Sequence, residues 1–121
     1  MRFEDTGFEK VTADLNRLDD VMPEFGLIRA EQWDYERVCY DRKFELKDGV
    51  YYLRILGYAT EGDVGAHRAT IKLLTPLLGK HYYPHGVEYG EGEYFPPHLI
   101  KQCQSILSEV KAAVDQFAVT K

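Results

Sequence analysis

The sequence lacks several features that would assign a protein to a functional class. It has no apolar run long enough to span a membrane, and the acidic start from Met1 to Asp5 has no apolar segment of the signal-peptide kind. We therefore expect no membrane partner and a cytoplasmic location. The glycines of residues 60–66 lack the spacing and the lysine of a phosphate-binding loop, and we expect no cofactor.

Cysteine and serine are both scarce. The two cysteines, Cys39 and Cys103, are far apart and too few for a disulfide framework or a thiolate zinc site. We expect two reduced, buried thiols. The two serines, Ser105 and Ser108, fall on the polar side of a predicted helix, and no G-x-S-x-G motif is present. A serine triad is therefore not expected.

The chain also has no excess of positive charge, and its formal net charge is −5. Residues 1–36 hold ten acids and four bases, a net −6, whereas residues 37–121 hold ten acids and eleven bases. An acidic first third disfavours nucleic acid and anionic membranes as partners. Such charges are typical of a solvated helix face.

The composition that is present is that of one globular domain. The chain has 121 residues, of which 45% are hydrophobic and nine are tyrosine. A chain of this length forms a single domain, residues 1–121, with one core.

The strongest local pattern is a β-hairpin. Two alternating runs, 33–47 and 50–59, meet at Asp48-Gly49, a pair that favours a two-residue type I′ turn. With this turn, Leu46 would lie opposite Tyr51 and Phe44 opposite Leu53. The hairpin then has one nearly apolar face, interrupted only by Arg42.

The alternation fails at the start of the first strand. Continued strictly, it would point Asp34 and Glu36 into the core and Trp33 and Tyr35 away from it. We predict a β-bulge or bend near residues 36–38 that turns Trp33 and Tyr35 inward. Bulges often lie beside functional sites.

Further segments complete an α+β fold. Thr12 is a candidate N-cap for a helix that carries Leu15 and Leu18 on one face and ends near Pro23. Short strands are predicted over residues 27–30, 67–75 and 81–89. Pro96-Pro97 opens a long last helix with an apolar stripe. We expect an antiparallel sheet of four to five strands, with the N-terminal helix and the long C-terminal helix packed on one face.

The second face of the hairpin is more apolar than a solvated sheet face requires. It carries Tyr52, Leu56 and Tyr58. A contiguous apolar patch of this kind marks an interaction surface. We expect a homodimer through this face.

One candidate site lies in residues 81–98, which hold three of the four histidines. His81, Tyr83, His85 and His98 are its candidate ligand-binding residues. In a strand, His81 and His85 would lie about 13 Å apart, too far to share a metal ion, so we expect no metal unless a turn forms at Pro84. The alternative interpretation is histidines that form structural hydrogen bonds among packed tyrosines.

A second candidate site is Trp33-Asp34-Tyr35-Glu36-Arg37, with Arg54 and Tyr58 nearby. Trp33, Tyr35 and Arg37 combine aromatic rings with a guanidinium that could hold a carboxylate or a sugar. The alternative is a core tryptophan flanked by surface ion pairs. No residue in either segment is assigned a catalytic role.

The segment Trp33–Arg37, the tyrosine-rich hairpin, the run His81-Tyr82-Tyr83-Pro84-His85-Gly86 and the closing helix together resemble the YugN-like family of small bacterial proteins. The resemblance implies a compact cytoplasmic domain and brings no catalytic residue. Our leading hypothesis is a non-enzymatic binding or interaction domain. The alternative is a small-molecule-binding protein or hydrolase that uses His, Tyr and Glu side chains of residues 81–98.

Overall fold

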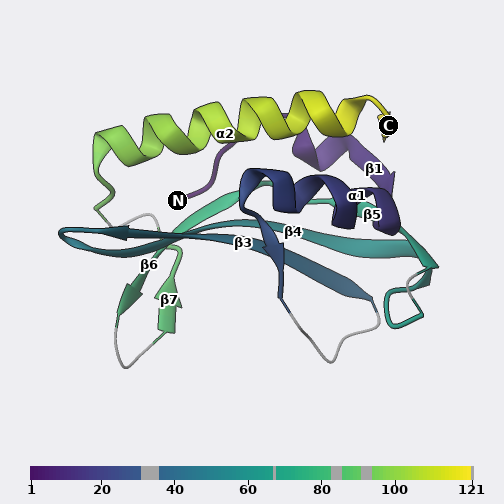
Figure 1. Ribbon diagram of the computed structural model, residues 1–121, viewed down its shortest axis with the longest axis horizontal. Helices are drawn as coiled ribbons and strands as arrows, with labels where there is room; N and C mark the ends of the chain where they lie inside the picture. Colours follow the sequence, from purple (N-terminus) through teal and green to yellow (C-terminus); the bar gives the residue numbers. More distant parts are fainter. Residues whose placement is uncertain (31–35, 67, 83–85, 91–93, 121) are drawn as a thin grey trace.

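The computed structural model describes the chain except residues 31–35, 67, 83–85, 91–93 and 121. Helices α1 and α2 cover one face of an antiparallel sheet, and none of the described helices lies on the other face (Figure 1). The elements in chain order are η1 (Phe8–Lys10), β1 (Val11–Asp14), α1 (Leu15–Val21), η2 (Met22–Phe25), β2 (Ile28–Arg29), β3 (Arg37–Leu46), β4 (Gly49–Asp63), β5 (Arg68–Leu73), β6 (Leu77–Tyr82), β7 (Gly86–Glu88), α2 (Pro97–Asp115) and β8 (Val119–Thr120).

The long strand β4 is the centre of the sheet. One of its edges pairs with β3 along its first ten residues, Gly49–Tyr58. The other edge forks: its first part pairs with β6 and its second part with β5. The described residues form eight strands in the order β2-β3-β4-β5-β1-β8, with β6 and β7 on the second branch. The α+β prediction is therefore confirmed, although the predicted count of four to five strands is too low.

The hairpin is present, but its predicted register is wrong by two residues. Leu46 pairs with Gly49 and Phe44 with Tyr51, so the turn residues are Lys47 and Asp48. Gly49 begins β4 with a φ of +155°, a conformation that L side chains rarely adopt, so the glycine is used just after the turn. A shift of two keeps every side chain on its predicted face.

The core face of the hairpin is accordingly the predicted one. Its side chains lie under the helices, and six of them are buried: Val38, Tyr40, Phe44, Tyr51, Leu53 and Ile55. Arg42, the predicted interruption, donates from Nη1 to the Phe25 carbonyl at 2.9 Å and lies over the Phe44 ring. Its guanidinium is thus satisfied at the edge of the core.

Of the two predicted irregularities near residues 36–38, a β-bulge or a bend, the structure has the bend. A bend lies at Glu36, and from Arg37 to Leu46 the pairing of β3 with β4 has no register shift. The Ala59 amide still donates to the Glu36 carbonyl at 2.6 Å. The register shift falls instead between Ala59 and Glu61, where β4 pairs with β5. The predicted inward turn of Trp33 and Tyr35 lies outside the described residues.

The N-terminal helix begins later than predicted. Thr12 is not its N-cap, because Val11–Asp14 form β1 between β5 and β8, and Asp14 precedes the helix. Pairing with two neighbouring strands outweighs the capping preference of a single threonine. Leu15 and Leu18 are fully buried, as their spacing predicted, and α1 ends before Pro23.

The strand predicted for residues 81–89 is also wrong in its bounds. It is a pair of antiparallel strands, β6 and β7, and β6 already begins at Leu77. Pro76 separates β5 from β6, because proline cannot donate to the ladder. Helix α2 begins at Pro97 as predicted, and it buries Leu99, Cys103, Ile106, Leu107, Val110 and Val114.

Candidate functional site

The sheet face away from the helices is the candidate functional surface, which we call the open face (Figure 1). Side chains alternate along a strand, so the residues of β3, β4 and β5 that lie between those of the core face point to this side. The open face carries Cys39, Asp41, Tyr52, Arg54, Leu56, Tyr58 and Lys72 on the strands, with Leu74 just after β5.

An ion pair crosses the middle of the open face. Asp41 and Arg54 are directly opposite in the β3–β4 ladder. The guanidinium donates from Nε to Asp41 Oδ1 at 2.8 Å and from Nη2 to Oδ2 at 2.9 Å. The Cys39 thiol donates to the same Oδ1 at 3.3 Å. A bidentate pair of this kind fixes geometry as well as charge, so the charge of Arg54 is paired and two of its five N–H donors are used.

Tyr89 covers this ion pair. Its ring lies 5.1 Å from the Arg54 guanidinium carbon, within cation–π range. The ring crosses β6 at Gly79, where an added Cβ would lie 2.5 Å from Tyr89 Cε1. Glycine at this position is therefore what lets the ring approach Arg54.

Burial suppresses the acidity of this cluster. Desolvation raises the pKa of the Cys39 thiol to about 12, with the Asp41 carboxylate adding to the effect. Desolvation also raises the pKa of Tyr89 to about 12, although Arg54 opposes the shift. A thiol that stays protonated is a poor nucleophile, so the raised pKa disfavours Cys39 as a nucleophile.

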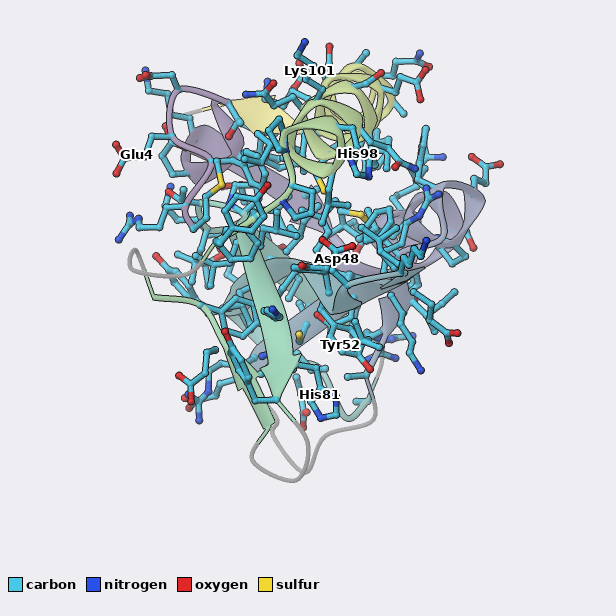
Figure 2. All side chains as sticks on the ribbon, turned by 90° about the vertical axis from the view of Figure 1, so that its left-hand side faces the viewer. Glu4, Asp48, Tyr52, His81, His98 and Lys101 are labelled. Atoms are coloured by element: carbon cyan, nitrogen blue, oxygen red, sulfur yellow. The ribbon has the colours of Figure 1, made fainter. Side chains whose placement is uncertain are left out.

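Tyr52 and His81 lie at one end of the open face. Their rings meet edge to face, with centroids 6.2 Å apart. In the end-on view both labelled side chains lie below the sheet, whereas His98 lies on the side of helix α2 (Figure 2). The described histidines His81 and His98 are thus on opposite sides of the sheet.

The other end of the open face is apolar. Leu56 follows Arg54 on this face, and Tyr58 follows Leu56. Tyr58 is 37% exposed and Leu74 is 38% exposed. The Leu74 amide donates to the Leu56 carbonyl, which places these two leucines side by side. We call Leu56, Tyr58 and Leu74 the apolar patch.

A cavity of about 260 Å³ lies where β5 and β6 diverge from β4. We call it the fork pocket, and its lining residues are Arg2, Glu9, Leu56, Leu74, Thr75 and Leu77. One carboxylate oxygen, Glu9 Oε2, is buried and has no hydrogen-bond partner among the described residues. The pocket therefore combines leucine walls with the Glu9 side chain, one oxygen of which has no hydrogen-bond donor among the described residues.

The structure places three of the predicted site residues and separates them. Arg37 pairs with Tyr58 and His81 pairs with Val50, so they lie eight residues apart along β4, roughly 26 Å at the usual strand rise. His98 is exposed in the first turn of α2. The other predicted residues, Trp33, Tyr35, Tyr83 and His85, lie outside the described residues.

Two features of the open face were not predicted from the sequence. The direct pairing of Asp41 with Arg54 did not follow from the sequence, because the predicted hairpin register was wrong by two residues. The fork pocket depends on Glu9 and Leu77, which are distant in sequence and meet only through the sheet. No local pattern marks them. Within the described residues, no three His, Cys, Asp or Glu side chains gather as a metal site.

Comparisons with known proteins agree with this architecture. The model of the YugN-like family matches residues 5–120. The chain belongs to the YugN-like family. Among the described residues of this YugN-like protein, no helix is both long and apolar enough to cross a membrane.

Two Bacillus subtilis (strain 168) proteins are relatives of this YugN-like chain. It is 56% identical over 110 residues to the uncharacterized protein YlbA. The aligned residues cover 91% of this chain and 92% of YlbA. It is 28% identical over 82 residues to the uncharacterized protein YugN. That alignment covers 67% of this chain and 61% of YugN.

A solved structure is similar over almost the whole YugN-like chain. The crystal structure of the uncharacterized conserved protein YugN from Geobacillus kaustophilus HTA426 is 55% identical in sequence and covers 96% of each chain, with a TM-score of 0.84. At this identity the likeness extends to the sequence as well as to the fold.

Proposed function

We propose that this YugN-like protein is a non-enzymatic interaction domain that forms a homodimer through the open face. The observation that carries the proposal is the apolar patch, in which Tyr58 and Leu74 are each more than a third exposed around Leu56. The helices cover only the opposite face of the sheet. Contiguous exposed apolar side chains on a sheet face are typical of an interaction surface.

The arrangement of β3 and β4 suits a two-fold interface. These strands have ten and 15 residues, long enough to provide a continuous surface for a second sheet. Two sheets that pack face to face do so about 10 Å apart and with their strands roughly aligned. A two-fold axis lets the same patch serve both copies.

The chemistry of the open face supports a binding role over catalysis. The Asp41 carboxylate is occupied by the Arg54 guanidinium, and burial raises the pKa of the Cys39 thiol to about 12. We place the domain in the cytoplasm, and two buried cysteines without a disulfide support that location. Among the described residues of 81–98, His81 and His98 lie on opposite sides of the sheet, which disfavours a hydrolase that uses both of them.

Sedimentation equilibrium over a range of concentrations tests the dimer. We expect the wild-type protein to dimerise and Tyr58→Glu to be a monomer, because the substitution puts a charge into an apolar interface. Leu56→Glu should do the same. The matched control is Tyr94→Glu, since Tyr94 is 66% exposed and lies outside the patch. A wild-type monomer at every concentration would overturn the proposal.

A further inference from the structure

The unsatisfied acceptor in the fork pocket indicates what should enter it. Glu9 Oε2 is buried without a hydrogen-bond partner among the described residues. Arg2 also lines the pocket, but its Nε lies 3.7 Å from Glu4 Oε1, and both of those side chains are more than half exposed. A buried carboxylate oxygen without a donor is costly. A cationic donor supplied from outside the chain would remove this cost.

The walls of the fork pocket indicate which chemical group should accompany the cationic donor. Leu56, Leu74 and Leu77 supply an apolar lining, and Thr75 and Arg2 complete it. A group with an apolar stem and a cationic head fits this combination. A lysine side chain has that chemistry, since its methylene stem packs on apolar surface and its ammonium donates three hydrogen bonds.

Lys72 is such a group on the same face. It lies on β5 opposite Tyr58 on one side and Thr12 on the other. Ile71 and Leu73 on either side of it are buried in the core, so Lys72 points to the open face. Among the described residues no carboxylate forms an ion pair with it. It is two residues from Leu74, at the edge of the pocket.

One two-fold axis brings Lys72 and the pocket together. Gly57 pairs with Leu73 in the centre of this region. A two-fold axis that runs between the two sheets, parallel to them and perpendicular to the strands, and that passes under this pair, places each position of one copy opposite its mirror position along the strand in the other copy. Tyr58 of each copy then faces Leu56 of the other, and Lys72 faces Leu74. The same axis therefore joins the apolar patches and places a lysine over each fork pocket.

We propose that in the dimer Lys72 of each copy enters the fork pocket of the other copy and pairs with Glu9. This inference rests on the proposed function and assigns the contact that sets the orientation of the two copies. The stem of Lys72 packs on the leucine walls, and its ammonium donates to the buried carboxylate. Because the interface is two-fold, the pair forms twice, and each copy completes the pocket of the other.

Charge reversal tests the pairing. Lys72→Glu would face Glu9 with a like charge, and Glu9→Lys would face Lys72, so each variant should raise the dimer dissociation constant at least roughly tenfold. The double variant Lys72→Glu/Glu9→Lys restores opposite charges and should return the constant to within a few-fold of wild type. Sedimentation equilibrium measures the constants, and chemical denaturation verifies that every variant folds.

The control is Lys43→Glu. Lys43 is on the open face opposite Tyr52, far from the proposed axis, and pairs with Glu45 at 3.2 Å. Its reversal should leave the dimer constant unchanged. A wild-type dimer that is insensitive to both single reversals, or a double variant that is no tighter than the singles, overturns the Lys72–Glu9 contact while the dimer stands.

Two further outcomes separate this inference from the proposal on which it rests. A coupling between Lys72 and Glu9 that appears in the unfolding free energy of the monomer and not in the dimer constant shows a pair within one chain, and overturns the contact between copies. A monomeric wild-type protein overturns both the dimer and the contact.

Discussion

At the scale of single residues, Gly79 has the most demanding surroundings on the open face. An added Cβ would lie 2.5 Å from Tyr89 Cε1 and 2.6 Å from Val87 Cγ1. The absence of a side chain lets the Tyr89 ring approach β6 closely and lie within 5.1 Å of the Arg54 guanidinium carbon. The glycine is needed for this close approach, since no positive φ is recorded there.

We predict that Gly79→Ala lowers the unfolding free energy by about 1–3 kcal/mol, the usual cost of overpacking. The added methyl group must displace the side chain of Tyr89 or of Val87. Val87 lies on β7, the strand that pairs with β6, and Tyr89 directly follows β7. Urea denaturation measures the change. Gly90→Ala is the matched control, because an added Cβ there meets nothing within 4 Å. A cost no larger than that of the control would show that Tyr89 is free to move away.

At the scale of elements, the alternation of the hairpin predicted more than its turn did. The turn was placed one residue late and the pairing two residues off, yet the core face is correct because the side-chain period is two. Tyr40 and Tyr51 are fully buried on the predicted side. The apolar spacing of α2 was sufficient for the same reason, since a helical stripe is a local property.

The elements that the sequence did not predict depend on long-range pairing. The segment Val11–Asp14 is too short to show a strand pattern of alternating apolar residues. It forms a strand because β5 and β8 pair with it on either side. The fork of β4 arises because Pro76 separates two strands that share one edge. Of the candidate site, the sequence predicted the side-chain types of the open face but neither the fork pocket nor the separation of His81 from Arg37.

The Asp41–Arg54 pair should couple β3 to β4 measurably. A double-mutant cycle with Asp41→Asn and Arg54→Gln is expected to give a coupling of about 1–3 kcal/mol, because the bidentate pair is partly shielded from water. The reference cycle is Lys43→Gln with Glu45→Gln, whose side chains are 51% and 72% exposed. Exposed pairs contribute less than about 1 kcal/mol, so equal couplings would contradict the prediction.

At the scale of the whole molecule, the two cysteines occupy both sides of the sheet. Cys39 lies on the open face beneath Asp41 and Arg54, and Cys103 lies in the core on α2. Desolvation raises the pKa of each thiol from 9.0 to about 12. Each layer of the molecule therefore contains one thiol that ionises more readily in the unfolded chain than in the folded one.

The sign of the pH dependence follows from proton binding. Below about pH 9 the thiols are protonated in both the folded and the unfolded chain, so their contribution is fully present. Between pH 9 and 12 the unfolded chain releases these protons while the folded chain keeps them, so the unfolding free energy falls as pH rises. The fall is up to about 1.4 kcal/mol per pH unit for each thiol.

Denaturation between pH 8 and pH 10 with a reductant present measures this slope, using Cys39→Ala/Cys103→Ala as the comparison. The double variant loses packing at every pH, but its unfolding free energy should stay nearly constant up to the range where tyrosines ionise, near pH 10. The wild-type value should fall within the same window. Parallel curves would mean that the thiols are as accessible to hydroxide in the folded protein as in the unfolded chain, and that neither layer of the sheet shields its cysteine.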